Sequence, residues 1–163
     1  MNDPVSVYIG LGSNLQNPKR QVETALVELA QLPDTSMVSH SSLYRSRPVG
    51  PQDQADFINA VAQLSTVLVA DALLDSLQQL ELKHHRVRTR RWGPRSLDLD
   101  LLLYSDQMID TPRLKVPHPE IAKRDFVLLP LHEIAPPDLS IPGLGLLQTL
   151  HTGIEGADVE RLS

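Results

Sequence analysis

Residues 90–104, RRWGPRSLDLDLLLY, place two carboxylates at alternate positions of a leucine-rich stretch. Successive side chains of a strand point to opposite faces, so Asp98 and Asp100 are predicted to project together, about 6–7 Å apart. The alternate leucines at positions 97, 99, 101 and 103 are predicted to face the core. Burying two unpaired negative charges costs several kcal/mol per ion. We therefore expect a cation beside this strand: an arginine, a metal ion or part of a substrate complex.

The segments around this stretch alternate between strand and helix patterns. Apolar side chains alternate over residues 5–11, and Gly10 and Gly12 then permit a close backbone approach or a tight turn. Prolines, glycine and aperiodic polar residues predict a loop over 46–56. Further strands are predicted over 37–44, 57–64 and 97–104. The first predicted helix begins at Asn17-Pro18 and ends before Pro33, and a second covers 70–85. Later helices are predicted over 124–134 and 146–152, with a short one that begins at His118. This β-α-β-β-α-β order followed by helices matches the ferredoxin-like plan, an α+β domain with a mainly antiparallel sheet.

The composition fits one globular domain. The 163 residues are 41% hydrophobic and 21% charged, which is ordinary for a soluble protein with a sizeable core. No apolar run approaches the ~18 residues that cross a bilayer, and the N-terminus has no signal-peptide pattern. The absence of cysteine excludes disulfides and thiolate metal sites and agrees with a reducing cytoplasm. The net charge of −5 argues against general nucleic-acid binding.

A basic segment precedes the two aspartates. No acidic residue lies between His84 and Arg95, whereas the arginines of this segment are Arg86, Arg88, Arg90, Arg91 and Arg95. Guanidinium groups bind phosphate oxygens in a bidentate manner, and two carboxylates without a thiol suit Mg²⁺. Together these features favour a metal-bound triphosphate. The alternatives are a solvated loop and aspartates that pair with the neighbouring arginines. The sequence contains no P-loop and no complete dinucleotide fingerprint.

The chain resembles the 6-hydroxymethyl-7,8-dihydropterin pyrophosphokinases, in collinear order, over about residues 5–137. The segments that carry the resemblance are YIGLGSN (8–14), RPVGPQDQADFINAV (47–61), RRWGPRSLDLDLLLY (90–104) and VPHPEIAKRDFVLLPLHEIAP (116–136). It implies a single pyrophosphokinase domain over residues 1–163, a ferredoxin-like α/β/α sandwich with extra C-terminal helices. Enzymes of this family transfer the diphosphate of ATP to the hydroxymethyl group of the pterin and release AMP, a step of folate biosynthesis. We expect a cytoplasmic monomer that binds these small molecules and neither nucleic acid nor membrane.

The resemblance also implies roles for individual residues. Asp98 and Asp100 would hold two Mg²⁺ ions that bridge the triphosphate of the co-substrate ATP. Arg86 and Arg95 would stabilise charge as the bond between the α- and β-phosphoryl groups breaks, and they complete the catalytic set. The ATP-binding positions are Gln78, Glu81, Arg88, Trp92, Leu99 (through its backbone), Arg113, Lys115, His118 and Arg124. No residue is assigned as a general base.

The resemblance places the pterin between Phe57 and Phe126, whose rings would sandwich it. Asn59 would pair with the polar edge of the pterin. Loop contacts, largely from the backbone, would come from Ser46, Pro48, Val49 and Gly50. Without the family, both phenylalanines would be interpreted as core residues and His118 as a helix N-cap or surface imidazole.

One position departs from the family. His85 stands where the family often has glycine, so we expect a stiffer basic segment that closes more slowly, which Trp92 fluorescence would test.

Two other function classes stay open from the residues alone. A nucleotide-binding module without catalysis is disfavoured because the carboxylates and arginines are present. A single-stranded RNA-binding sheet is disfavoured by the charge and by an aromatic content of 4%.

Overall fold

Strand β5 (Asp98–Tyr104) forms one edge of the central sheet in the computed structural model, which describes residues 3–15, 17–47, 56–84, 97–150 and 159–162. The other strands of this sheet are β1 (Val5–Ser13), β2 (Thr35–His40), β3 (Tyr44–Ser46), β4 (Phe57–Thr66) and β10 (Val159–Arg161). They lie in the order β10-β3-β4-β1-β5, with β2 also paired to β4, and every pairing is antiparallel. The predicted α+β, ferredoxin-like sheet is confirmed.

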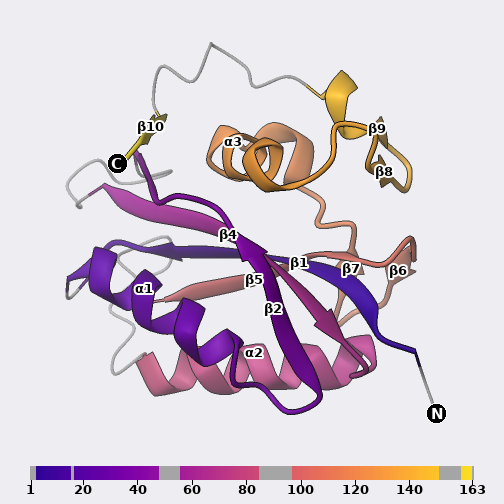
Figure 1. Cartoon of the computed structure of the whole chain (residues 1–163), viewed down its shortest axis with the longest axis horizontal. Coiled ribbons are helices and arrows are strands. Elements are labelled where there is room, and N and C mark those ends of the chain that lie inside the picture. Colours follow the sequence, from indigo (N-terminus) through magenta and orange to yellow (C-terminus); the bar gives the residue numbers. More distant parts are fainter. Residues whose placement is uncertain (1–2, 16, 48–55, 85–96, 151–158, 163) are drawn as a thin grey trace.

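The sheet is the middle of three layers (Figure 1). Helices α1 (Pro18–Leu29) and α2 (Ala70–His84) cover one face, and α3 (Asp125–Ile134) covers the other. Each face has its own apolar core because strand residues alternate between faces. In β4, Ile58 and Ala60 pack in the core under α1 and α2, whereas Val61 packs in the core under α3. The alternation predicted for residues 57–64 is therefore confirmed.

The single strand predicted over 37–44 is wrong, because the chain forms two short strands that both pair with β4. Ser41 lies between β2 and β3, where the regular pairing with β4 is interrupted. Its N–H donates to the Val61 carbonyl at 2.8 Å, and its hydroxyl accepts the Val61 N–H at 3.0 Å. A side chain thus replaces a backbone acceptor here, and the regular ladder is interrupted. The sequence analysis also did not predict β10.

The leucines of β5 do not all share one face. Leu97, Leu99 and Leu101 pack under α1 and α2 as predicted, but Leu102 and Leu103 pack in the core under α3. The register explains this, since Leu103 faces Tyr8 and Leu101 faces Ile9, which leaves Leu102 as an extra residue. Such a bulge ends the strict alternation, so the prediction for Leu103 was wrong.

The C-terminal part is less helical than predicted. α3 is present and continues through Pro130. Of the helix predicted over 146–152, residues 146–150 are described, and they contain only a 3₁₀ turn, η2 (Leu147–Thr149). The short helix predicted from His118 is another 3₁₀ turn, η1 (Ile121–Lys123). Two small hairpins complete this part, β6 (Ile109–Asp110) with β7 (Lys115–Val116) and β8 (Ser140–Ile141) with β9 (Gly145–Leu146). Within the described ranges, every helix is too short or too polar to span a membrane.

A polar cluster joins α1 to the last turn of α2. The His84 ring lies between Glu28 and Gln21, with 2.6 Å between its Nε2 and the Glu28 carboxylate, and Lys83 reaches the other Glu28 oxygen at 3.1 Å. Both ring nitrogens face side-chain oxygen atoms. Burial raises the pKa of the Glu28 carboxyl, but the bonds from His84 and Lys83 lower that pKa further, to below its usual value. The ionised carboxylate therefore stabilises the fold.

We expect Glu28→Gln to lower the free energy of unfolding by about 1–2 kcal/mol at pH 7, because a charged hydrogen-bond acceptor is lost. A carboxyl whose pKa is depressed on folding stabilises above its unfolded pKa, roughly 4.3, and this contribution disappears as the pH falls through the folded value. The difference between wild type and variant should thus be smaller at pH 3 than at pH 7. Urea unfolding at both pH values measures this, with Glu23→Gln on the exposed side of α1 as the control. Equal stabilities at pH 7 would contradict the prediction.

Candidate active site

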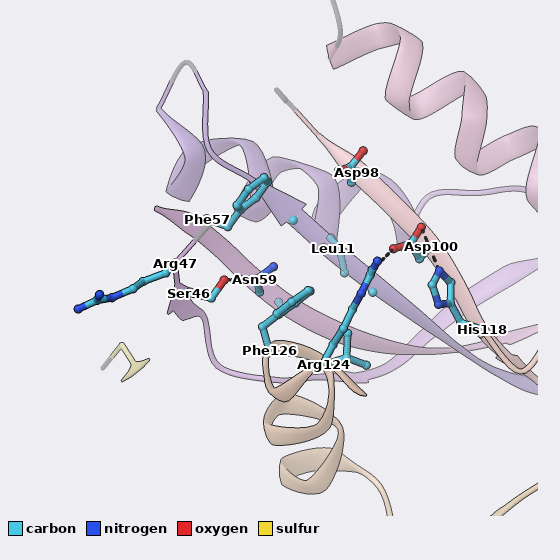
Figure 2. A pocket seen from close by; sticks show the side chains of 14 residues that line it. Leu11, Ser46, Arg47, Phe57, Asn59, Asp98, Asp100, His118, Arg124 and Phe126 are labelled. Carbon is cyan, nitrogen blue, oxygen red and sulfur yellow. Dashed lines mark hydrogen bonds and ion pairs between the residues drawn. The ribbon is translucent and has the colours of Figure 1, made fainter. Parts of the chain in front are cut away.

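A cavity of ≈ 290 Å³ opens on the α3 side of the sheet, over β1, β4 and β5. Its walls come from strands and from the loop and first turn of α3, so most of its lining residues have fixed backbones (Figure 2). The lining residues are Gly10, Leu11, Gly12, Ser46, Arg47, Phe57, Asn59, Ala60, Asp98, Asp100, His118, Arg124, Phe126 and Val127.

Asp98 and Asp100 both face this cavity, as the i, i+2 spacing predicted. In the register of β1 with β5 they stand opposite Gly12 and Gly10, so no side chain of β1 fills the space between them and the solvent. The Asp100 side chain is 42% exposed, which keeps its desolvation cost well below that of a fully buried ion.

The cations nearest to Asp100 come from the segment before α3. His118 Nε2 and Arg124 Nη1 each lie 3.9 Å from an Asp100 carboxylate oxygen, a distance that allows attraction but no hydrogen bond. The guanidinium of Arg124 also lies over the Phe126 ring, 5.5 Å from its centre. The Arg124 guanidinium therefore neutralises the Asp100 carboxylate in part, and neither group forms a hydrogen bond with it, so the carboxylate keeps lone pairs for another ligand.

The orientation of His118 is set by the backbone around it. The Glu120 N–H donates to His118 Nδ1 at 3.1 Å, so in the neutral ring the proton is on Nε2, which faces Asp100. Burial lowers the pKa of the His118 imidazole below its usual value, although Asp100 raises it in part. The N-cap alternative from the sequence is wrong, because Glu120 is the residue that precedes η1 and no side chain caps this turn. The His118 ring instead binds the Glu120 N–H and also reaches the cavity.

Two aromatic rings and an amide form the other part of the cavity. Phe57 at the start of β4 and Phe126 in the first turn of α3 enter it from different elements, with Asn59 between them (Figure 2). The buried Ser46 hydroxyl donates to Asn59 Oδ1 at 2.6 Å, which fixes the amide plane. A Cβ at Gly12 would lie 3.1 Å from Asn59 Nδ2, so glycine is required for this close approach. Of the two interpretations of Gly12, the close approach is correct, because it lies within β1.

Several predicted ATP-binding residues do not line the cavity. Arg113 binds the Asp75 carboxylate and lies 3.4 Å from Gln78 Oε1, which brings two predicted residues together. Lys115 pairs with Asp110. The Leu99 N–H donates to Glu81 Oε2 at 2.9 Å, so this backbone donor is already engaged.

The remaining predicted positions fall outside the part of the chain that the structure describes. They are Pro48, Val49, Gly50, His85, Arg86, Arg88, Trp92 and Arg95. Conversely, Arg47, Ala60 and Val127 line the cavity and were not singled out in the sequence. Each is adjacent in sequence to a predicted residue. Alternation could not have found Ala60, because neighbours in a strand point to opposite faces and its side chain packs under α1 and α2.

The donor set fits a hard divalent cation. No group of three or more metal-binding side chains occurs among the described residues, so the site offers a pair of carboxylates and no complete protein cage. Magnesium is usually bound by one or two carboxylates together with waters and substrate phosphates. Asp98 and Asp100, at the two partly exposed positions of an otherwise buried strand, meet this requirement.

Comparison with known proteins identifies the family. Residues 8–136 match the family model of 7,8-dihydro-6-hydroxymethylpterin-pyrophosphokinase (HPPK). The chain is 49% identical to the 2-amino-4-hydroxy-6-hydroxymethyldihydropteridine pyrophosphokinase of Pseudomonas aeruginosa, over 96% of both chains. It is 48% identical to the protein of the same name from Haemophilus influenzae, over 90% of this chain and 91% of the other.

A solved structure supports the fold alone. The crystal structure of Plasmodium falciparum HPPK-DHPS wild type with SDX-DHP aligns with a TM-score of 0.70 at 11% identity. The alignment covers 96% of this chain and 47% of the Plasmodium chain, so our chain spans about half of that protein. With the family match and the two bacterial relatives, the conclusion is that this chain belongs to the 7,8-dihydro-6-hydroxymethylpterin-pyrophosphokinase family.

Proposed function

We propose that this cavity is where the chain performs the reaction of its family, the transfer of diphosphate from ATP to the hydroxymethyl group of 6-hydroxymethyl-7,8-dihydropterin. The products are the pterin diphosphate and AMP, and the reaction is a step of folate biosynthesis. One observation carries the proposal: a pair of carboxylates and a slot between two phenylalanines open into the same cavity. The first suits a metal-bound phosphate chain, and the second suits a flat heterocycle.

The pterin is assigned to the slot between Phe57 and Phe126. Both rings are partly exposed and face the cavity, unlike core phenylalanines. Asn59 supplies an amide whose orientation is fixed by Ser46, so it can meet the polar edge of the ring without reorganising. Polar ring atoms left unpaired in such a slot would weaken binding. Pro48, Val49 and Gly50 are proposed as loop contacts from the family resemblance.

The triphosphate of ATP is assigned to the side of Asp98 and Asp100. We propose that these carboxylates hold two magnesium ions together with phosphate oxygens. Magnesium bound there supplies positive charge that neutralises the phosphates and polarises their bonds. Arg124 and His118 lie on the same side and are placed to meet phosphate oxygens. The further ATP contacts proposed from the resemblance are Gln78, Arg88, Trp92, Leu99, Arg113 and Lys115. The resemblance also implies Glu81, but its carboxylate already accepts the Leu99 N–H.

In the chemical step the hydroxymethyl oxygen of the pterin attacks the β-phosphorus of ATP. The bond from this phosphorus to the oxygen bridging the α-phosphorus breaks, and AMP leaves with the bond's electron pair. The hydroxyl proton is released in the same step. The chain's contribution is to hold the two substrates in line and to neutralise charge, the latter also by Arg86 and Arg95. We further propose that the chain works in the cytoplasm as a monomer.

Asp98→Asn and Asp100→Asn should each lower the turnover number by at least about 100-fold, because the removed charge no longer holds the metal against the phosphates. Neither change should unfold the chain, because asparagine has the same shape and the carboxylates face a cavity rather than a packed core. The measurement is AMP formation from ATP and the hydroxymethyl pterin at saturating magnesium.

The matched control is Asp106→Asn, an exposed aspartate just beyond β5. Turnover by either cavity variant within a few-fold of wild type would refute the assignment. A wild-type chain that binds ATP and pterin but forms no AMP would show a binding module without catalysis.

Gly12→Ala should raise the KM for the pterin roughly tenfold and leave the KM for ATP nearly unchanged. The new methyl group would press on Asn59 Nδ2, and Asn59 cannot retreat freely because Ser46 holds its other end. Gly10→Ala is the comparison, because its methyl would meet only the Leu102 side chain, at 3.4 Å. Steady-state kinetics with each substrate varied in turn would decide. An equal pterin KM in all three proteins would contradict the assignment of Asn59 to the pterin site.

A further inference from the structure

Leu99 lies between the two cavity carboxylates, on a strand that has a sheet neighbour on one side. β5 is the last strand in the sheet order, and β1 is the strand that pairs with it. Backbone groups of an edge strand that point away from the sheet need another partner or water. For Leu99 this partner is a side chain, because its N–H donates to Glu81 Oε2 at 2.9 Å.

The bond joins the site strand to the helix layer behind the sheet. Glu81 belongs to α2, and the Leu99 side chain is buried in the core under α1 and α2, 5% exposed. Asp98 and Asp100 point to the other face, toward the cavity. The peptide that links the two aspartates is therefore held from one side by β1 and from the other by a carboxylate. A hydrogen bond to an ionised acceptor is stronger than one between neutral groups.

Glu81 does not act as a third ligand of the carboxylate pair. It does not line the cavity, and no three metal-binding side chains come together in the described parts of the chain. The start of β5 also needs support, since the strand begins at Asp98 itself. Without the bond to Glu81, the first residues of the strand would be held by their pairing with β1 and by the packing of Leu97 and Leu99.

We propose that Glu81 is a positioning residue that fixes the separation and direction of Asp98 and Asp100 through the Leu99 N–H. This inference rests on the proposed function, because it assigns the pair to a divalent cation. It differs from the ATP contact that the family resemblance implies for Glu81, which requires the carboxylate to touch the nucleotide. The two roles respond differently to a neutral acceptor at this position.

The test compares Glu81→Ala, Glu81→Gln and the control Glu23→Ala, an exposed glutamate of α1. Glutamine keeps an oxygen that can accept the Leu99 N–H, whereas alanine has none. Three quantities are measured: hydrogen exchange of the Leu99 amide in the free protein, affinity for MnCl₂ in the presence of ATP, and the Mg²⁺ concentration that gives half-maximal AMP formation.

In Glu81→Ala we expect Leu99 exchange to be at least about tenfold faster and both cation requirements to rise about tenfold. In Glu81→Gln we expect all three quantities to stay within about threefold of wild type. Glu23→Ala should match wild type throughout.

Two results would overturn the inference. One is a Glu81→Ala protein with wild-type Leu99 exchange and wild-type cation requirements. The other is a Glu81→Gln protein that is as impaired as the alanine variant and loses ATP affinity without any divalent cation, which would make Glu81 a direct nucleotide contact. A wild-type protein that binds Mn²⁺ and ATP but forms no AMP would instead end the proposed function. The expected exchange and Mn²⁺ results would then still support the positioning role.

Discussion

The antiparallel register between β1 and β5 is the constraint on which the site depends. It sets Asp98 opposite Gly12 and Asp100 opposite Gly10, so each carboxylate faces a residue without a side chain. A shift by one residue would turn both aspartates into the core under α1 and α2, where an unpaired charge costs several kcal/mol. The same shift would bring Leu99 and Leu101 to the cavity. The apolar packing of these leucines thus fixes the register and, with it, the position of the charges.

The environment of Asp100 contrasts with that of Glu133, whose carboxylate is engaged in hydrogen bonds within the protein. Glu133 accepts bonds from the Ser42 N–H and hydroxyl at 2.9–3.0 Å and from the Tyr44 hydroxyl at 2.7 Å. Burial, together with this bond and the charge of Glu133, raises the pKa of Tyr44 to about 12. These hydrogen bonds engage both Glu133 oxygens and connect α3 to the start of β3. Asp100 has the Arg124 guanidinium and the His118 ring at 3.9 Å, too far for a hydrogen bond, so its oxygens can still bind another cation.

Much of the fold followed from the sequence because periodicity reports directly on burial. The alternation in 57–64 and 97–101 identified the faces of β4 and β5, and the aspartate spacing identified the cavity side. The bulge at Leu102 and the division between β2 and β3 could not be predicted, since both depend on the register with a distant strand. The same holds for the Ser46–Asn59 and Glu81–Leu99 bonds, which join residues from different elements. Sequence patterns indicate which face a residue takes, whereas such pairs exist only after the elements pack.

Arg113 and Lys115, two basic residues proposed to bind ATP, form exposed ion pairs within the protein. Arg113 pairs with Asp75, and Lys115 pairs with Asp110, in both cases between side chains that are largely exposed to solvent. Exposed pairs contribute only about 0–1 kcal/mol each, so a triphosphate with several charges can replace these carboxylates at little cost. Glu81 differs, because its bond to Leu99 joins α2 to the strand that carries the proposed metal ligands and does not require nucleotide. On the proposed assignment, backbone bonds hold the carboxylates of this site, while exposed ion pairs hold the basic side chains proposed to meet ATP.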